Sequence, residues 1–156
     1  KPEMISNAYR KWYAEQGSLG LQDEPLFPGM FKLINDLKIN KEFHIGVATN
    51  KSRIALNNGL KKHNLINIFD ITLTMDEAKA KPDPDMAIQA MSMLNIEKKS
   101  TIIVGDTIND IGLGVNAGIN SIGVAWGYNS IEMLRNEGAD FIIKDTEELF
   151  DTIINL

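Results

Sequence analysis

Hydrophobic and polar positions follow two alternating patterns along this chain. Short apolar runs, rich in branched and aromatic residues, end at polar residues, as strands buried on both faces of a sheet do. These runs cover residues 43–49, 69–75, 101–106, 120–126 and 140–145. The segments between them have the patterns of helices. The predicted helices cover residues 30–38, 52–65, 83–96, 107–118, 130–139 and 146–156.

Strands that alternate with helices predict an α/β fold, a Rossmann-like parallel sheet with helices on both faces. The expected helix ends agree with this order. Ser52 is a candidate N-cap, and Asp83 is another, with Pro84 as the first helical residue. Gly118 is placed to end a helix. In such sheets ligands bind beyond the carboxyl ends of the strands, so the residues just after each strand are candidates for a site.

The beginning of the chain differs from the rest and suggests a separate element. Ile5, Tyr9 and Trp12 are spaced as on an amphipathic helix. Residues 23–30 then break regular structure with two prolines and a glycine. We therefore expect residues 1–25 to be part of a small helical element, and residues 26–156 to form the sheet domain.

Composition narrows the possible functions. The 156 residues are enough for one domain with a hydrophobic core. The formal net charge is −5, so we expect no nucleic-acid partner. No apolar run approaches the ~20 residues that span a bilayer, so we expect no membrane partner. The absence of Cys excludes disulfides and thiolate metal sites and fits a cytoplasmic protein. For a small parallel-sheet protein we expect a monomer or a homodimer.

Polar residues at the predicted strand ends form a candidate site. Thr49 and Asn50 follow the first visible strand, and Asp106 and Asp110 follow the third. Lys81 lies between them in the sequence, just before a proline. A hydroxyl and a lysine suit phosphate oxygens, whereas two carboxylates suit Mg²⁺. Since an unpaired carboxylate at a buried strand end is costly, a cation there would also explain Asp106.

Each of these residues also has a purely structural interpretation. Thr49 could end a strand or cap the next helix, and Lys81 could be a solvated surface lysine. Asp110 lies three residues after Thr107, which is the spacing of a capping box. Asp106 has no such structural role in the pattern. Asp76 and Glu77 also follow a strand, and the sequence gives them no role.

The strand-end residues lie in motifs that resemble those of the haloacid dehalogenase superfamily of hydrolases. "VATNK" (47–51) resembles the second family motif and "KPDP" (81–84) resembles the third. "VGDTINDIGLGVNAG" (104–118) resembles the fourth motif, with a second Asp four places after the first. The tail, with "GVAWGYNS" (123–130) and "GADFIIKDTEEL" (138–149), resembles the phosphoglycolate phosphatase-like branch.

The resemblance implies roles for the candidate residues. Thr49 and Lys81 would be catalytic, and together with Asn50 they would bind the phosphate. Asp106 and Asp110 would hold Mg²⁺. The implied activity is hydrolysis of a small phosphorylated metabolite through an aspartyl-phosphate intermediate.

One family motif is missing from the sequence. The Asp-x-Asp pair that supplies the family's nucleophile should follow a first strand, and nothing before Phe27 matches it; "LQDEP" (21–25) follows no strand. The resemblance then identifies residues 1–25 as the remnant of a helical cap, and residues 26–156 as a core without its first strand. We expect two inner strands to be left unpaired, the chain alone to be inactive and not stably folded, and the natural protein to extend further upstream.

Two other functions remain open at this stage. A β-phosphoglucomutase-like phosphoryl transfer would use the same scaffold. A non-catalytic phosphate-binding or regulatory module, such as a response-regulator receiver domain, would lack a nucleophile altogether, although its acidic pair should follow the first strand. A nucleotide-binding Rossmann domain would need a glycine-rich turn that "VATNKS" (47–52) does not provide.

Overall fold

Within residues 24–156, the predicted strands and helices all form, in the predicted order. The structure is a computed structural model that describes residues 24–156. Its strands are β1 (Gly46–Thr49), β2 (Ile71–Thr74), β3 (Ile102–Gly105), β4 (Asn120–Val124) and β5 (Phe141–Ile143). The helices of this part are α2 (Met30–Ile39), α3 (Arg53–Lys62), α4 (Asp85–Leu94), α5 (Ile108–Ala117), α6 (Ile131–Glu137) and α7 (Thr146–Asn155), with a short 3₁₀ turn, η1 (Lys98–Ser100).

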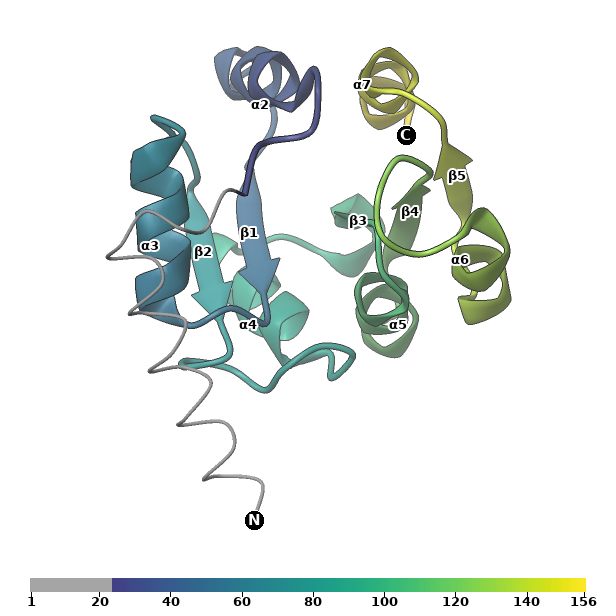
Figure 1. The fold of residues 1–156 in the computed structure, drawn as a ribbon. Coiled ribbons are helices and arrows are strands. Elements are labelled where there is room, and N and C mark those ends of the chain that lie inside the picture. Colours follow the sequence, from purple (N-terminus) through teal and green to yellow (C-terminus); the bar gives the residue numbers. More distant parts are fainter. Residues whose placement is uncertain (1–23) are drawn as a thin grey trace.

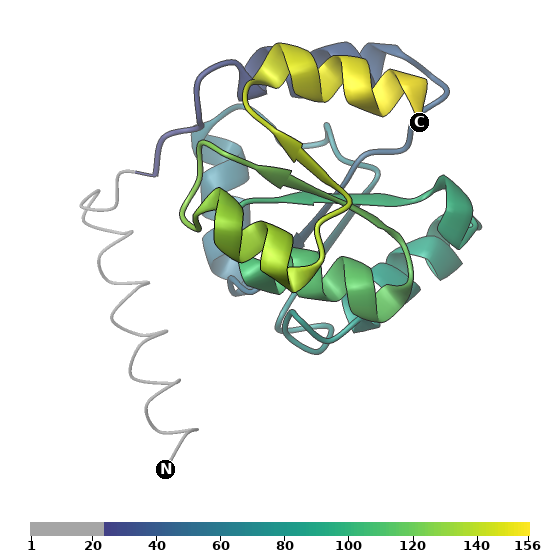
Figure 2. The same ribbon diagram turned by 90° about the vertical axis from the view of Figure 1, so that its right-hand side faces the viewer.

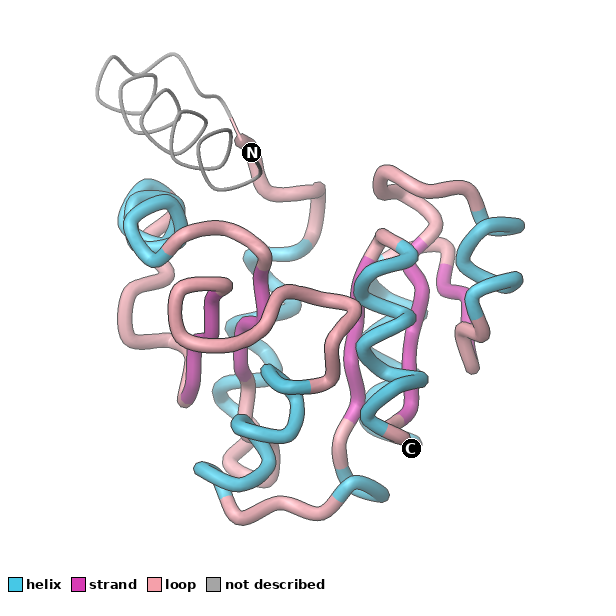
Figure 3. Tube along the Cα trace, turned by 90° about the horizontal axis from the view of Figure 1, so that it is seen from below, coloured by secondary structure: helices cyan, strands magenta, loops and turns pink. Residues whose placement is uncertain are grey.

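The strands form two parallel sheets instead of one. β1 pairs with β2, and β3 pairs with β4, which pairs with β5 (Figures 1 and 3). Within residues 24–156, no strand pairs with the edge of β1 that faces β3. β1 and β3 are thus paired on one side only within this part, which agrees with the expectation that two inner strands would have unpaired backbone groups. The prediction that every strand is buried on both faces is wrong for β1, β3 and β5, whose residues are mostly half-buried or exposed. Each of these strands pairs on one side only within the described part.

Two hydrophobic clusters hold the sheets together, one on each face. On one face α2 and α7 lie side by side, and Leu33, Leu37 and Leu149 pack against the side chains of β4 and β5 (Figure 2). On the other face, side chains of α4 and α5 such as Met86 and Leu113 pack with residues of β1, β2 and β3. The pairing of the sheets thus depends on side chains, since β1 and β3 share no backbone ladder.

Most of the predicted helix ends are correct. Ser52 caps α3 by accepting from the backbone N–H of Ala55, and Gly118 ends α5 with φ of 69°. The predicted start of α4 is wrong by one residue. Pro84 is the N-cap and the helix begins at Asp85, because Asp83 accepts from the N–H of Asp85 in the turn before the helix.

Residues 1–23 lie outside the described part. The predicted cap remnant and its amphipathic helix fall almost entirely there, so the boundary between residues 25 and 26 stays a prediction. In the part that the structure describes, no helix has the length and apolar character needed to cross a membrane.

The two-cluster packing can be tested at Ile122, in the middle of β4. Its side chain has no exposed surface. We expect Ile122→Ala to lower the free energy of unfolding of the full-length protein by about 2–5 kcal/mol, because it leaves a cavity. Urea denaturation measures this change. Ile88→Ala is the matched control, since Ile88 is 49 % exposed on α4 and should change stability by less than about 0.5 kcal/mol. Equal effects of the two changes would contradict the assigned core.

Candidate functional site

Lys81 is the centre of the polar contacts at the carboxyl ends of β1 and β3. Its Nζ donates to the carbonyl of Ala48 in β1 at 2.8 Å and to Oδ1 of Asp110 in α5 at 2.5 Å. Its side chain is only 11 % exposed, and that of Asp110 only 8 %. The turn before α4 thus places a mostly buried ammonium group between the two sheets.

Asn50 holds the backbone of Lys81 with both ends of its side-chain amide. The N–H of Lys81 donates to Oδ1 of Asn50 at 2.7 Å, and Nδ2 of Asn50 donates to the carbonyl of Lys81 at 3.0 Å. The loop after β1 and the turn before α4 are therefore aligned by a two-point contact. This leaves the backbone of Asn50, not its side chain, as the part suited to a ligand.

Asp110 uses both of its carboxylate oxygens. Oδ1 accepts from Lys81, and Oδ2 accepts from the backbone N–H of Thr107 at 3.0 Å and from its hydroxyl at 2.6 Å. The predicted capping box between Thr107 and Asp110 is present. Gly105 leaves room for this arrangement, because a Cβ at that position would lie 2.2 Å from the Asp110 side chain. Asp110 therefore helps to fix the start of α5 and to orient Lys81.

Asp106, at the end of β3, is held by the loop after β4. Its Oδ2 accepts from the N–H of Tyr128 at 2.9 Å, and its carbonyl accepts from the N–H of Asn129 at 3.0 Å. The side chain of Asn129 in turn accepts from the N–H of Ile108 at the start of α5. Among residues 24–156, no donor is found for Oδ1 of Asp106. One carboxylate oxygen thus remains open to a ligand.

Thr49 ends β1 next to Ala48. Its hydroxyl oxygen accepts from the N–H of Lys51 at 3.2 Å, and the residue is half-buried. The side chain of Lys51 pairs with Glu24.

Some candidate residues are in direct contact, whereas others are only chain neighbours of residues that are in contact. Asn50 and Asp110 each form hydrogen bonds with Lys81. Thr49 and Asp106 lie beside residues that contact this trio, and we find no hydrogen bond from either side chain to Lys81 within the described part. No cluster of three or more potential metal-ligating side chains occurs in residues 24–156. The catalytic, phosphate-binding and metal-binding roles of these residues stay predictions.

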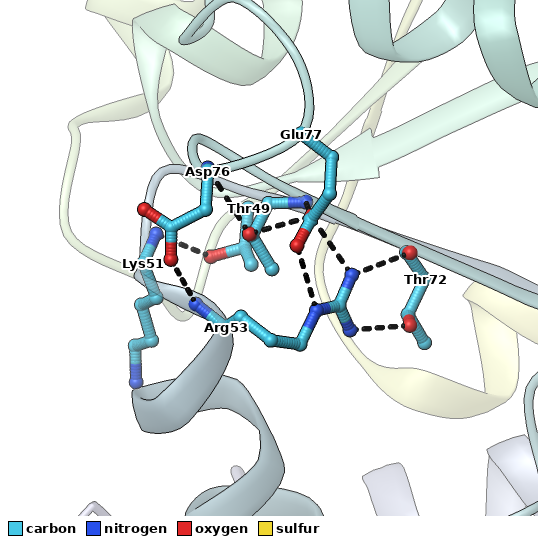
Figure 4. A network of polar contacts seen from close by, with 7 residues as sticks. Thr49, Lys51, Arg53, Thr72, Asp76 and Glu77 are labelled. Atoms are coloured by element: carbon cyan, nitrogen blue, oxygen red, sulfur yellow. Dashed lines mark hydrogen bonds and ion pairs between the residues drawn. The ribbon is translucent and has the colours of Figure 1, made fainter.

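Sequence reasoning missed a set of polar contacts beside Thr49 (Figure 4). Arg53, at the start of α3, forms a two-point ion pair with Glu77, in the turn after β2. The Arg53 guanidinium is the main reason that the pKa of Glu77 falls to about 2, and hydrogen bonds from Thr74 lower it further. Because this folded-state pKa lies below the ordinary value of 4.5, the contribution of Glu77 to stability is present above pH 4.5 and is lost as the pH falls toward 2. Charge spacing in the sequence gives no signal for the pair, whose members are 24 positions apart.

The close approach of Gly127 to Asp106 gives a test of the site geometry. A Cβ at Gly127 would lie 2.0 Å from the Cβ of Asp106, so a methyl group forces one of the two loops to move. We expect Gly127→Ala to lower the free energy of unfolding by about 1–3 kcal/mol.

Gly59 in α3 provides the matched control for this change. A Cβ there meets nothing within 4 Å, and Ala is the better helix former. Gly59→Ala should therefore raise stability, by up to about 1 kcal/mol. Urea denaturation of both variants of the full-length protein measures the contrast, and an unchanged Gly127→Ala variant would show that the loop does not constrain Asp106.

Comparison with known proteins identifies the family of this chain. The chain is 31 % identical over 121 residues to the "Pyrophosphatase PpaX" of Bacillus velezensis, a match that covers 77 % of this chain and 56 % of the relative. A crystal structure of a predicted phosphatase from Clostridium acetobutylicum matches with a TM-score of 0.74 at 33 % identity, over 83 % of this chain and 60 % of that one. A predicted phosphoglycolate phosphatase from Haemophilus somnus shares the fold, with a TM-score of 0.82 at 22 % identity, over 92 % of this chain and 64 % of that one.

The chain spans about half the length of the curated relatives that it matches. A family model described as "Haloacid dehalogenase-like hydrolase" matches residues 1–124, a range that includes all five candidate site residues. The match agrees with the motifs that the sequence shows around Thr49, Lys81 and Asp106. This chain belongs to the haloacid dehalogenase-like hydrolase family.

Proposed function

We propose that this chain forms the larger part of a Mg²⁺-dependent phosphatase that hydrolyses a small phosphomonoester. The observation that carries the proposal is the position of Lys81. Its ammonium group is mostly buried, anchored from two sides and set at the carboxyl edge of both sheets, next to the Thr49 loop. A fixed positive charge at that edge suits the negative charge of a phosphoryl group in its transition state.

In this proposal some residues around Lys81 contact the phosphate and others hold Lys81 in position. The hydroxyl of Thr49 and the ammonium of Lys81 donate to phosphate oxygens, and the Asn50 backbone completes the contact. The Asn50 side chain instead keeps Lys81 in register with the loop. Asp110 balances the charge of Lys81 and limits its movement.

The open oxygen of Asp106 fits a hard divalent cation. Carboxylate oxygens are the ligands that Mg²⁺ prefers, and Asp106 is held from its other oxygen by the N–H of Tyr128. Asp110 has both oxygens engaged by Lys81 and Thr107, so its predicted metal role is less well supported than that of Asp106. When bound, Mg²⁺ would offset the negative charge of the phosphate and of the carboxylates around it.

The nucleophile of this proposal is an aspartate that lies outside this chain. Its carboxylate oxygen attacks phosphorus, and the P–O bond to the ester oxygen breaks as the second aspartate of the missing pair donates a proton, so that the alcohol leaves. The same aspartate then takes a proton from water, whose oxygen attacks phosphorus, and this step releases inorganic phosphate and restores the first carboxylate. The substrate class that goes with this proposal is a small phosphorylated metabolite in the cytoplasm. Because a relative is named as a pyrophosphatase, inorganic pyrophosphate belongs in the same assay as phosphoglycolate.

Asp106→Asn tests the carboxylate at the end of β3. In the full-length protein with Mg²⁺, we expect this change to lower kcat for p-nitrophenyl phosphate at least a hundredfold, because the amide removes the negative charge that holds the cation. Asp151→Asn on α7 is the matched control, since Asp151 is exposed and lies away from the strand ends. Full turnover in Asp106→Asn would remove Asp106 from the mechanism. A wild-type protein that binds inorganic phosphate but hydrolyses neither p-nitrophenyl phosphate, phosphoglycolate nor pyrophosphate would instead indicate a non-catalytic binding module.

Lys81→Ala tests the charge at the centre of the site. We expect kcat/KM to fall on the order of a hundredfold or more, because the transition state loses its fixed cation. Lys99→Ala should leave the rate unchanged, since the Lys99 side chain is 80 % exposed and pairs with Glu97 at the surface. Circular dichroism on each variant separates a catalytic loss from unfolding, and a Lys81→Ala protein that is folded and fully active would contradict the proposal.

A further inference from the structure

A polar network lies at the carboxyl ends of β1 and β2, and we call it the Arg53 clamp (Figure 4). It consists of Arg53, Thr72, Thr74, Asp76 and Glu77. The guanidinium of Arg53 contacts both oxygens of Glu77, at 3.0 and 2.9 Å. It also donates to the hydroxyl of Thr72 at 2.7 Å and to its carbonyl at 2.8 Å. With these four contacts the guanidinium faces β2 and not the site, so Arg53 is not placed to bind phosphate itself.

A second set of contacts in the clamp fixes the turn after β2. Oε2 of Glu77 accepts from the N–H of Thr74 at 2.9 Å and from its hydroxyl at 2.7 Å, and Thr74 is fully buried. Asp76 accepts from the backbone N–H of Arg53 at 2.7 Å. The turn is therefore attached both to the end of β2 and to the first residue of α3.

The clamp lies between the two segments that meet at the candidate site. Residues 50–52 connect Thr49 to Arg53, so a fixed Arg53 limits where this loop can go. Residues 78–80 connect Glu77 to Lys81, so a fixed Glu77 limits where Lys81 begins. Because Asn50 meets the Lys81 backbone in a two-point contact, small shifts of either segment would break both hydrogen bonds.

We infer that Arg53 and Glu77 are positioning residues for the phosphate site, which set the Thr49 loop against Lys81 without touching the substrate. This inference rests on the proposed function, because it assigns the purpose of the clamp to that site. It predicts that a change in the clamp lowers kcat/KM and the protection of the Lys81 amide more than the loss of thermal stability alone would.

The chain offers a matched ion pair at the opposite end of the same two strands. Lys38 of α2 pairs with Asp70 at 2.6 Å, and Asp70 also accepts from the N–H of Ile45, just before β1. The side chains of this pair are 35 % and 25 % exposed, against 30 % and 37 % for Arg53 and Glu77. It therefore resembles the clamp in exposure and in joining β1 to β2, but lies far along the strands from Lys81.

The experiment compares Glu77→Gln with Asp70→Asn in the full-length protein. The first measurement is kcat and KM for p-nitrophenyl phosphate with Mg²⁺ between pH 6 and 8. The second is amide hydrogen exchange at Lys81, whose N–H donates to Asn50. We expect Glu77→Gln to lower kcat/KM about tenfold and to speed exchange at Lys81 about tenfold. Asp70→Asn should change each by less than about twofold, even where the two variants lose similar thermal stability.

Two outcomes would overturn the inference. One is an equal effect of both variants on kcat/KM and on exchange at Lys81, which would make the clamp a purely structural ion pair. The other is a Glu77→Gln variant in which both kcat/KM and the amide exchange rate at Lys81 are the same as in the wild type. If Glu77→Gln fails to fold, Arg53→Lys takes its place, since it keeps the charge but loses the two-point geometry.

The exchange measurement keeps this inference separate from the proposed function. A wild-type protein without phosphatase activity would reject the proposed function, yet faster exchange at Lys81 in Glu77→Gln alone would still show that the clamp sets this geometry. An active wild type in which Glu77→Gln and Asp70→Asn behave alike would reject the clamp and leave the proposed function in place.

Discussion

The ion pair between Lys81 and Asp110 is the interaction on which the rest of the site depends. It joins a turn beside the β1–β2 sheet to the helix that follows β3, where no backbone ladder connects the two sheets. A buried pair is costly to desolvate, and it is tolerated only when its remaining donors and acceptors are satisfied. Here Ala48 accepts a second hydrogen bond from the ammonium, and Thr107 satisfies the second carboxylate oxygen.

The two aspartates near the start of α5 are held in different ways. Asp110 caps its own helix, orients Lys81 and packs against Gly105, so its position is determined from three directions. Asp106, four residues earlier, is held on one side only and keeps an oxygen open. At the start of α5, both carboxylate oxygens of Asp110 are hydrogen-bonded, whereas one oxygen of Asp106 is available to a ligand.

The sequence was enough to predict the elements, because they depend on local patterns. Strand and helix positions follow from apolar periodicity, and the caps at Ser52, Thr107 and Gly118 follow from residues within a few positions of one another. The set of strand-end candidates followed from the rule that parallel strands place their carboxyl ends at one edge. That rule predicts a common edge for Asn50, Lys81 and Asp110, and the structure joins Asn50 and Asp110 through Lys81.

The contacts that depend on how distant segments meet could not be predicted in this way. Asn50 and Lys81 are 31 positions apart, and Arg53 and Glu77 are 24 apart, so their pairing is set by the register of β1 on β2. The close contact of Gly127 with Asp106 depends on the loop after β4, which periodicity does not describe. The half-buried state of β1 and β3 is a property of the split sheet, and their composition alone resembles that of fully buried strands.

The split between β1 and β3 also bears on how the chain behaves among other molecules. Parallel strands with open N–H and C=O groups are templates for intermolecular pairing, and their half-exposed branched side chains favour such contacts. Self-association into aggregates would then compete with folding while these edges stay uncovered, and the competition would sharpen as concentration rises. The part of the molecule that holds Lys81 between the two sheets is thus also a part exposed to misassembly.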